Sequence, residues 1–200
     1  MDSRGEEKAW NILSGLDYSS VSVNASVSSS EHEGFYTVKS FCTDFYVYPV
    51  RKRIHTDSQW GNTLLNKYGY FFRHACLWYL VYVKNIPLTG RLVKPADIKG
   101  GELFFRGTHE LPLARIGKLY GNDRDAFIRK GRELCGELTS YGDVSFNLFP
   151  LPRMPVTIIL WLRDEEFPSR AELLFDSSCA IHLPVDIIWS LAMLSVLVMI

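Results

Sequence analysis

Apolar residues recur at three- and four-residue steps along several stretches of the chain, which is the spacing of one helical face. The longest such stretch covers residues 62–83, and Pro87 lies shortly after it. The same spacing predicts shorter helices over residues 5–16 and 124–138, and one within residues 102–120 that is marked by Leu111, Leu113, Ile116 and Leu119. Because each helix would carry its apolar side chains on one face, we expect these helices to pack against a shared core.

Strand patterns lie on both sides of these helices. Residues 35–49 hold two β-rich runs around Cys42, which predicts a hairpin. Residues 19–34 are dominated by serine, with weak apolar alternation. We interpret them as an edge strand or a flexible linker.

A second group of strands is predicted near the C-terminus. Residues 144–148 alternate between apolar and polar, and residues 156–162 are apolar and β-branched, as in a central strand. Residues 163–168 read as a charged turn, and residues 171–175 as the returning strand.

Strands and helices are therefore segregated along the chain rather than alternating. This order predicts an α+β fold with two antiparallel β-hairpin regions packed with several helices. We expect an N-terminal helix and serine-rich segment at residues 1–33 and a single α+β domain at residues 34–200.

The C-terminal stretch, residues 187–200, contains only apolar and small residues. A membrane-spanning helix needs about 20 such residues, so this stretch is too short. We predict a buried terminal helix. A short tail anchor and a homodimer interface are the alternatives, because a helix that is apolar on all sides must be covered.

Composition narrows the function classes. The 22 basic and 22 acidic residues balance to zero net charge, which argues against a nucleic-acid-binding protein. The polar N-terminus has no apolar region typical of a signal peptide. Four widely spaced cysteines form no C-x-x-C pair, so we expect free thiols in a reducing cytoplasm.

Common catalytic motifs are absent, including the P-loop, the dinucleotide-binding glycine motif and the zinc-protease motif. Charged residues concentrate instead near the second hairpin, at Arg163, Asp164, Glu165, Glu166, Arg170 and Asp176. Such carboxylates beside arginines can bind a cation or a basic group, or act as general acid and base. The alternative interpretation is a solvated turn whose charges protect a sheet edge.

Cys179 and His182 are three residues apart and can share one helical face. Two ligands are too few for a metal site, which would also need Cys76 or His74. We therefore predict no metal and interpret the pair as a partly buried thiol and a surface imidazole. The sequence indicates no particular cofactor.

The C-terminal half carries a distinctive series of short motifs. They are Pro152-Arg153-Met154-Pro155, Trp161, Asp164-Glu165-Glu166-Phe167-Pro168 and Leu174-Phe175-Asp176. Looser agreement lies upstream, at Tyr79-Leu80, Pro87-Leu88-Thr89-Gly90, Gly100-Gly101 and Phe104. Together they resemble the uncharacterised bacterial and archaeal family called domain of unknown function 3786, which is common in anaerobes.

The resemblance implies no activity. Some relatives are fused to iron–sulfur modules, which implies an anaerobic redox or corrinoid setting. This chain lacks the cysteine runs of such a module, so it would be the partner of an iron–sulfur or corrinoid protein.

The first hypothesis is a non-catalytic binding or accessory domain that recognises a small ligand or a protein. Its pocket would be lined by Trp161, Phe104 and Tyr79, with Arg153, Glu166 and Arg170 at the mouth. The second hypothesis is an enzyme in which Glu165, Glu166 or Asp176 acts with His74 or His109. The third is a homodimer built on the C-terminal helix.

Overall fold

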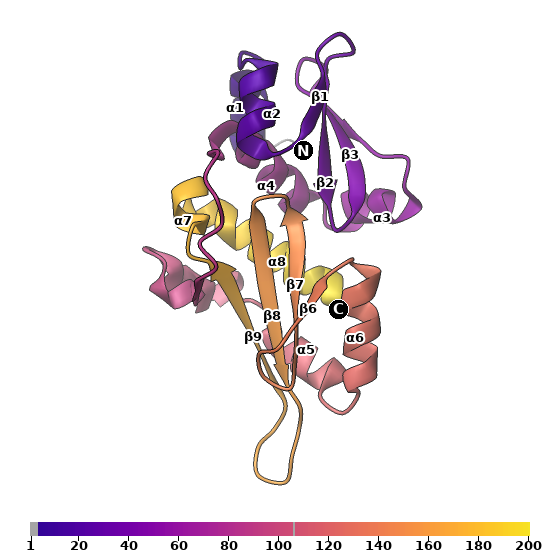
Figure 1. Ribbon diagram of the computed structural model, residues 1–200, viewed down its shortest axis with the longest axis vertical. Helices are drawn as coiled ribbons and strands as arrows, with labels where there is room; N and C mark the ends of the chain where they lie inside the picture. The colour runs from indigo at the N-terminus through magenta and orange to yellow at the C-terminus, as the bar shows by residue number, and fades with distance from the viewer. Residues whose placement is uncertain (1–3, 106) are drawn as a thin grey trace.

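The strands form two antiparallel sheets in the computed structural model, which describes residues 4–105 and 107–200 (Figure 1). The first sheet has the order β1-β2-β3-β4, and the second has the order β5-β9-β8-β7-β6. The strands are β1 Ser28–Ser30, β2 Phe35–Ser40, β3 Thr43–Tyr48, β4 Arg53–His55, β5 Leu92–Val93, β6 Glu137–Thr139, β7 Val144–Leu151, β8 Met154–Trp161 and β9 Arg170–Asp176. The α+β fold class and both predicted hairpins are confirmed.

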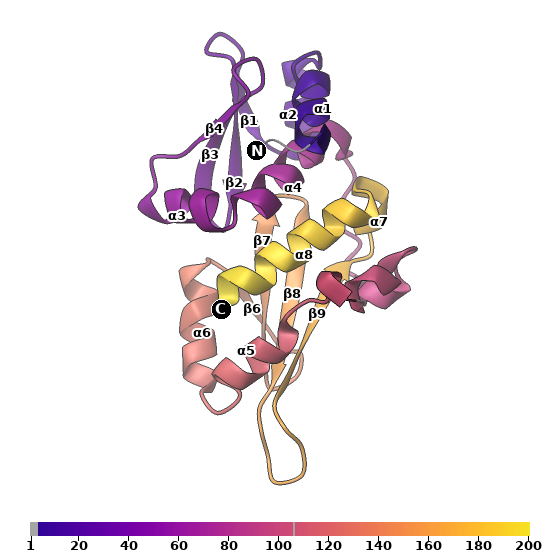
Figure 2. The same cartoon turned by 180° about the vertical axis from the view of Figure 1, so that it is seen from behind.

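The helices cover the sheets and join them. They are α1 Arg4–Leu13, α2 Tyr18–Ala25, α3 Gln59–Lys67, α4 Gly69–Tyr82, α5 Leu113–Tyr120, α6 Arg124–Glu133, α7 Cys179–His182 and α8 Val185–Met199. Three short 3₁₀ turns precede α5, at Pro95–Asp97, Gly101–Phe105 and Gly107–His109. Figures 1 and 2 show α1 and α2 beside the first sheet, while α8 crosses one face of the second.

The C-terminal helix α8 is buried within the chain, as predicted. Eleven of its fifteen residues are buried, and it packs on α4 and β7. The Tyr120 hydroxyl donates to the carbonyl of Met199 at 2.6 Å, which satisfies a backbone oxygen at the helix end. Among the described residues, no helix combines the length and apolarity that a bilayer crossing requires.

The serine-rich segment is more ordered than predicted. Only Ser28–Ser30 forms an edge strand, whereas Tyr18–Ala25 forms helix α2. The Asp17 carboxylate accepts the backbone amide of Ser20 at 2.7 Å, which caps this helix. Val21 and Ala25 are buried in the same core as the rest of the chain, and this burial stabilises a helix that serine-rich sequence alone disfavours.

The predicted long helix over residues 62–83 is two helices, α3 and α4, separated at Tyr68. The Tyr68 backbone leaves the helical region, with ψ at 14°. The Arg73 guanidinium donates to the carbonyl of Leu65 at 3.3 Å, near the end of α3. This bond satisfies an oxygen that the break leaves without a helical partner.

The helix predicted within residues 102–120 is α5, which begins late in that stretch. Gly107 has a positive φ of 56°, and Pro112 directly precedes α5, so the continuous helix covers only Leu113–Tyr120. Helix α6 likewise ends at Glu133 rather than at residue 138. The Gly136 amide closes this helix end by donating to the carbonyl of Gly131 at 2.8 Å.

The expectation of four free thiols is wrong. Cys42, in the β2–β3 turn, forms a disulfide with Cys135, which follows α6. Cys76 and Cys179 are free and buried. The pairing joins residues 93 positions apart, a relationship that depends on the packing of the two sheets and leaves no local pattern in the sequence.

Candidate functional site

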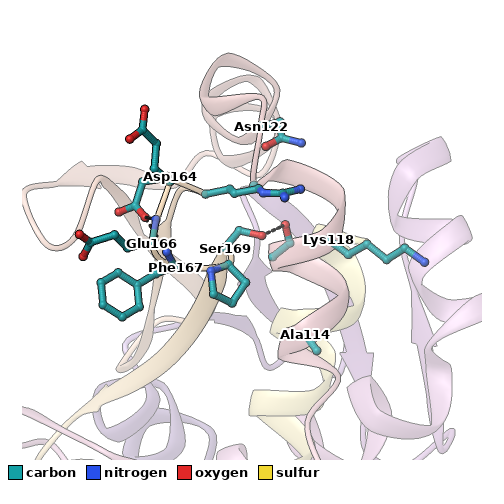
Figure 3. Close-up of a pocket in the computed structure, with 12 residues that line it drawn as sticks. Ala114, Lys118, Asn122, Asp164, Glu166, Phe167 and Ser169 are labelled. Atoms are coloured by element: carbon teal, nitrogen blue, oxygen red, sulfur yellow. Dashed lines mark hydrogen bonds between the residues drawn. The ribbon is translucent and has the colours of Figure 1, made fainter.

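The loop between β8 and β9, residues 162–169, extends away from the rest of the molecule (Figure 1). On the side that faces α5 it borders a cavity of about 630 Å³. The residues that line this cavity are Ala114, Gly117, Lys118, Gly121, Asn122, Arg163, Asp164, Glu165, Glu166, Phe167, Pro168 and Ser169 (Figure 3). The cavity therefore has both basic and acidic side chains at its walls.

Hydrogen bonds within the loop give it a defined shape. One carboxylate oxygen of Asp164 accepts the amides of Glu166 and Phe167, at 2.9 and 2.6 Å. The Asp164 amide in turn donates to the carbonyl of Phe167 at 3.1 Å. This local pattern is typical of an aspartate that organises a turn. It leaves the Glu165 and Glu166 carboxylates exposed.

Helix α5 holds the base of the loop through two glycines. The Arg163 amide donates to the carbonyl of Gly121 at 2.9 Å. The Ser169 hydroxyl donates to the carbonyl of Gly117, also at 2.9 Å (Figure 3). A Cβ atom on Gly121 would lie 2.2 Å from the Ser169 Oγ atom, and one on Gly117 would lie 3.1 Å from the Ser169 carbonyl oxygen. Gly121 thus needs a residue without a side chain, whereas a side chain at Gly117 would require the backbone at Ser169 to move by a few tenths of an ångström. Their four-residue spacing on one helix face was the available signal, and sequence reasoning missed it.

The other side of the loop borders a second cavity of about 580 Å³. Its walls include Trp161, Asp164, Phe167 and Arg170. The Arg170 guanidinium lies over the Trp161 ring at 4.4 Å from its centre, and the two residues are directly paired across β8 and β9. This contact shields one ring face with a cation and orders the long arginine side chain. The two cavities bring together five of the predicted site residues: Trp161, Asp164, Glu165, Glu166 and Arg170.

Asp176 lies outside the two loop cavities, and its carboxylate is occupied by hydrogen bonds from the chain itself. Its carboxylate accepts the amide and hydroxyl of Thr89, the amide of Gly90, and the amide and hydroxyl of Ser178, at 2.7 to 3.1 Å. Burial disfavours its charge, but the bonds from Ser178 and Thr89 outweigh burial and lower the pKa of the carboxyl. A carboxylate with this many donors is poorly suited to take up a proton in catalysis.

Arg153 also binds the chain itself. Its guanidinium donates to the carbonyls of Val23, Asn24 and Ile86 and, at 2.6 Å, to the side-chain oxygen of Asn85. Its amide donates at 3.1 Å to the hydroxyl of Tyr79, a fully buried residue whose hydroxyl donates to the carbonyl of Ala25. Phe104 is fully buried and packs on Phe175. Arg153, Tyr79 and Phe104 therefore do not join Trp161 in one pocket.

Two histidines and a carboxylate line a third cavity, away from the loop. His74 and His109 line a small cavity of about 210 Å³ together with Asp186 and Trp189. The Trp189 indole donates to the carbonyl of His109 at 2.6 Å. Burial lowers the pKa of His74, opposed by the nearby charge of Asp186. No histidine is among the described residues that line the two loop cavities.

Cys179 and His182 are both buried on α7. The Nδ1 atom of His182 accepts the Lys84 amide at 3.4 Å. Within residues 4–105 and 107–200, no three histidine, cysteine or acidic side chains gather closely enough to hold a metal ion.

With this geometry in place, comparison with protein-family models matches residues 17–197 to Domain of unknown function (DUF3786). The chain belongs to this family. Searches of curated proteins and of solved structures found no match.

The short motifs of the C-terminal half and those upstream of it divide into two groups by their place in the fold. Arg153 and Asp176, with Thr89 and Gly90, bind other segments of the chain and stabilise the DUF3786 domain. The motif Asp164–Pro168 lies in the projecting loop, where its acidic side chains and Phe167 are exposed. Within this series of motifs, the loop is the part that remains free to contact another molecule.

Proposed function

We propose that this chain is a non-catalytic binding or accessory domain that recognises a protein partner through the loop at residues 162–169. The observation that carries the proposal is the exposure of Phe167 at 66% on a loop that its own hydrogen bonds hold in shape. A large apolar side chain presented this way can be buried by a partner at little cost in ordering the loop.

The chemistry of the loop indicates the partner surface. Glu165 and Glu166 are exposed beside Phe167, and Lys118 lines the facing wall of the larger cavity. A partner with an apolar recess bordered by arginine or lysine would bury Phe167 while pairing with the two carboxylates. On the family resemblance alone, we propose that this partner is an iron–sulfur or corrinoid protein of anaerobic prokaryotic metabolism.

Site-specific photo-crosslinking tests the proposal. A benzophenone amino acid replaces Phe167 in one chain and Val50, which is at least as exposed, in a control chain. Both chains are expressed in anaerobically grown cells of the source organism. Val50 is 76% exposed and lies in the turn between β3 and β4. We expect one protein to be crosslinked from position 167 and not from position 50.

The affinity of the captured partner then decides whether the loop chemistry matters. We expect Glu165→Lys with Glu166→Lys to weaken binding by about tenfold or more, whereas Glu137→Lys leaves it unchanged. Equal crosslinking from positions 50 and 167, or binding that is insensitive to charge reversal on the loop, would overturn the proposal.

A second candidate function, an enzyme, is favoured by one observation at the histidine cavity. The buried Nδ1 atom of His74 has no hydrogen-bond partner among the described residues, and His74 shares that cavity with Asp186 and His109. In this proposal Asp186, rather than Glu165, Glu166 or Asp176, supplies the carboxylate. Turnover from a panel of ester, amide and phosphoester substrates should be lost in His74→Gln and retained in His32→Gln; absence of turnover in the wild type would exclude it.

A further inference from the structure

The Cys42–Cys135 disulfide is on the surface, unlike the two free thiols. Both of its residues are exposed, whereas Cys76 and Cys179 are buried. Burial raises the pKa of each free thiol to about 12, so neither forms a reactive thiolate near neutral pH. The exposed pair is therefore the part of the cysteine chemistry that an external thiol can reach.

Both ends of the disulfide lie in left-handed backbone, where a side chain is disfavoured. Cys42 has φ at 57° in the two-residue β2–β3 turn, and Cys135 has φ at 51° just after α6. Glycine or asparagine is the ordinary residue at such positions. A cysteine at either position is strained relative to glycine, and the group that it adds there is a sulfur atom.

The disulfide borders a cavity of about 540 Å³ that is large enough to admit part of another molecule. Lys39 and Asp44 line this cavity and flank the turn that carries Cys42, with 3.8 Å between their charged atoms. Lys39 lines the same cavity as the two cysteines, and a cation that reaches an exchanging sulfur favours a thiolate over a thiol. The cavity thus combines access for a thiol with a cation at its wall, which is paired with Asp44.

We propose that Cys42 and Cys135 form a reversible thiol–disulfide exchange site for a dithiol reductant, bound at this cavity. A thiolate of the dithiol attacks one sulfur, the Cys42–Cys135 bond breaks, and the other sulfur leaves as a thiolate that takes a proton from water. The second thiolate of the dithiol then attacks the mixed disulfide and releases the remaining cysteine. The reductant is oxidised to its own disulfide, and the protein gains two electrons and two protons.

Reduction removes the covalent link between the two sheets. The Phe41 amide still donates to the carbonyl of Phe149 at 2.9 Å, and Phe41 remains buried beside Cys42. The turn is therefore positioned to bring the sulfurs together again, so that the same site can be reoxidised.

Alkylation of the native protein tests the inference, with the number of added groups counted by mass spectrometry. We expect no alkylation before reduction and two added groups, at Cys42 and Cys135, after dithiothreitol treatment. In a separate experiment, a C-x-x-C dithiol protein replaces dithiothreitol as the reductant. Reduction of the disulfide by both reductants shows that the site accepts a protein dithiol. Reduction by dithiothreitol alone assigns the site to small dithiols. Full reoxidation by oxidised dithiothreitol is expected.

Lys39→Glu is the test variant, and Lys99→Glu is its control. We expect the first to slow reduction by about fivefold and the second to leave it unchanged, since Lys99 is exposed and outside the cavity. The inference fails if Cys42 and Cys135 are alkylated before any reduction and form no disulfide with oxidised dithiothreitol. It also fails if reduction is no faster than global unfolding, because the disulfide would then be purely structural.

Discussion

Thr89 donates two hydrogen bonds to the carboxylate of Asp176, from its amide at 3.1 Å and from its hydroxyl at 3.0 Å. These bonds join the segment after α4 to the end of β9, across 87 positions of sequence. Asp176 lies outside both loop cavities, so its role is to stabilise the fold around the loop.

We expect Asp176→Asn to lower the free energy of unfolding by about 2–4 kcal/mol, because an amide group presents donors to the donors of Thr89, Gly90 and Ser178. Urea denaturation measures the change. Asp125→Asn, at an exposed position on α6, is the control and should alter the free energy by less than about 0.5 kcal/mol. Equal, small effects of the two substitutions would contradict this role for Asp176.

Stability should fall as the pH drops below about 6.5. Burial and the charge of Arg153 lower the pKa of His182, opposed by Asp176, and burial lowers the pKa of His74. The unfolded chain then binds more protons than the folded chain between the lowered pKa values and the ordinary value of 6.5. Stability is full above that window and is lost as the pH falls through it.

Thermal unfolding at a series of pH values measures this dependence. We expect His182→Gln to flatten the curve between pH about 7 and 5, whereas His32→Gln, at an exposed position, leaves its slope unchanged. An unchanged slope in His182→Gln would show that this histidine titrates equally in both states.

Arg153→Lys should loosen helix α2 without unfolding the chain. Lysine keeps the charge but cannot reach the carbonyls of Val23, Asn24 and Ile86 together, because it lacks the guanidinium fork. We expect amide hydrogen exchange over residues 18–26 to accelerate by about tenfold, with β8 unchanged. Arg129→Lys, at an exposed position, is the control; identical exchange in both variants would refute the prediction.

Deleting residues 187–200 should abolish the fold, since α8 supplies buried side chains to the single core. Circular dichroism and light scattering test this against deletion of Ile200 alone, which should leave a folded chain. A folded, monomeric truncation of a dimeric full-length protein would instead favour the homodimer built on this helix.

Some of these features were determined by the sequence itself. The β2–β3 hairpin, the β8–β9 hairpin with its charged turn, and the buried C-terminal helix all follow from local patterns: β-rich runs, a charged turn and the length of an apolar run. Such patterns involve residues that are close together in the sequence, so the sequence shows them directly. The short motifs at Arg153, at Asp164–Pro168 and at Asp176 are contiguous stretches of sequence and are visible for the same reason.

Tertiary structure alone decided what those residues contact. It placed Arg153 and Asp176 against segments far away in sequence, moved Tyr79 and Phe104 into the core, and left Asp164–Pro168 exposed. It also made α2 helical by burying Val21 and Ala25, and it brought Cys42 to Cys135. Each of these outcomes depends on the packing of two sheets across long sequence separations, and residue type and spacing carry no information on such contacts.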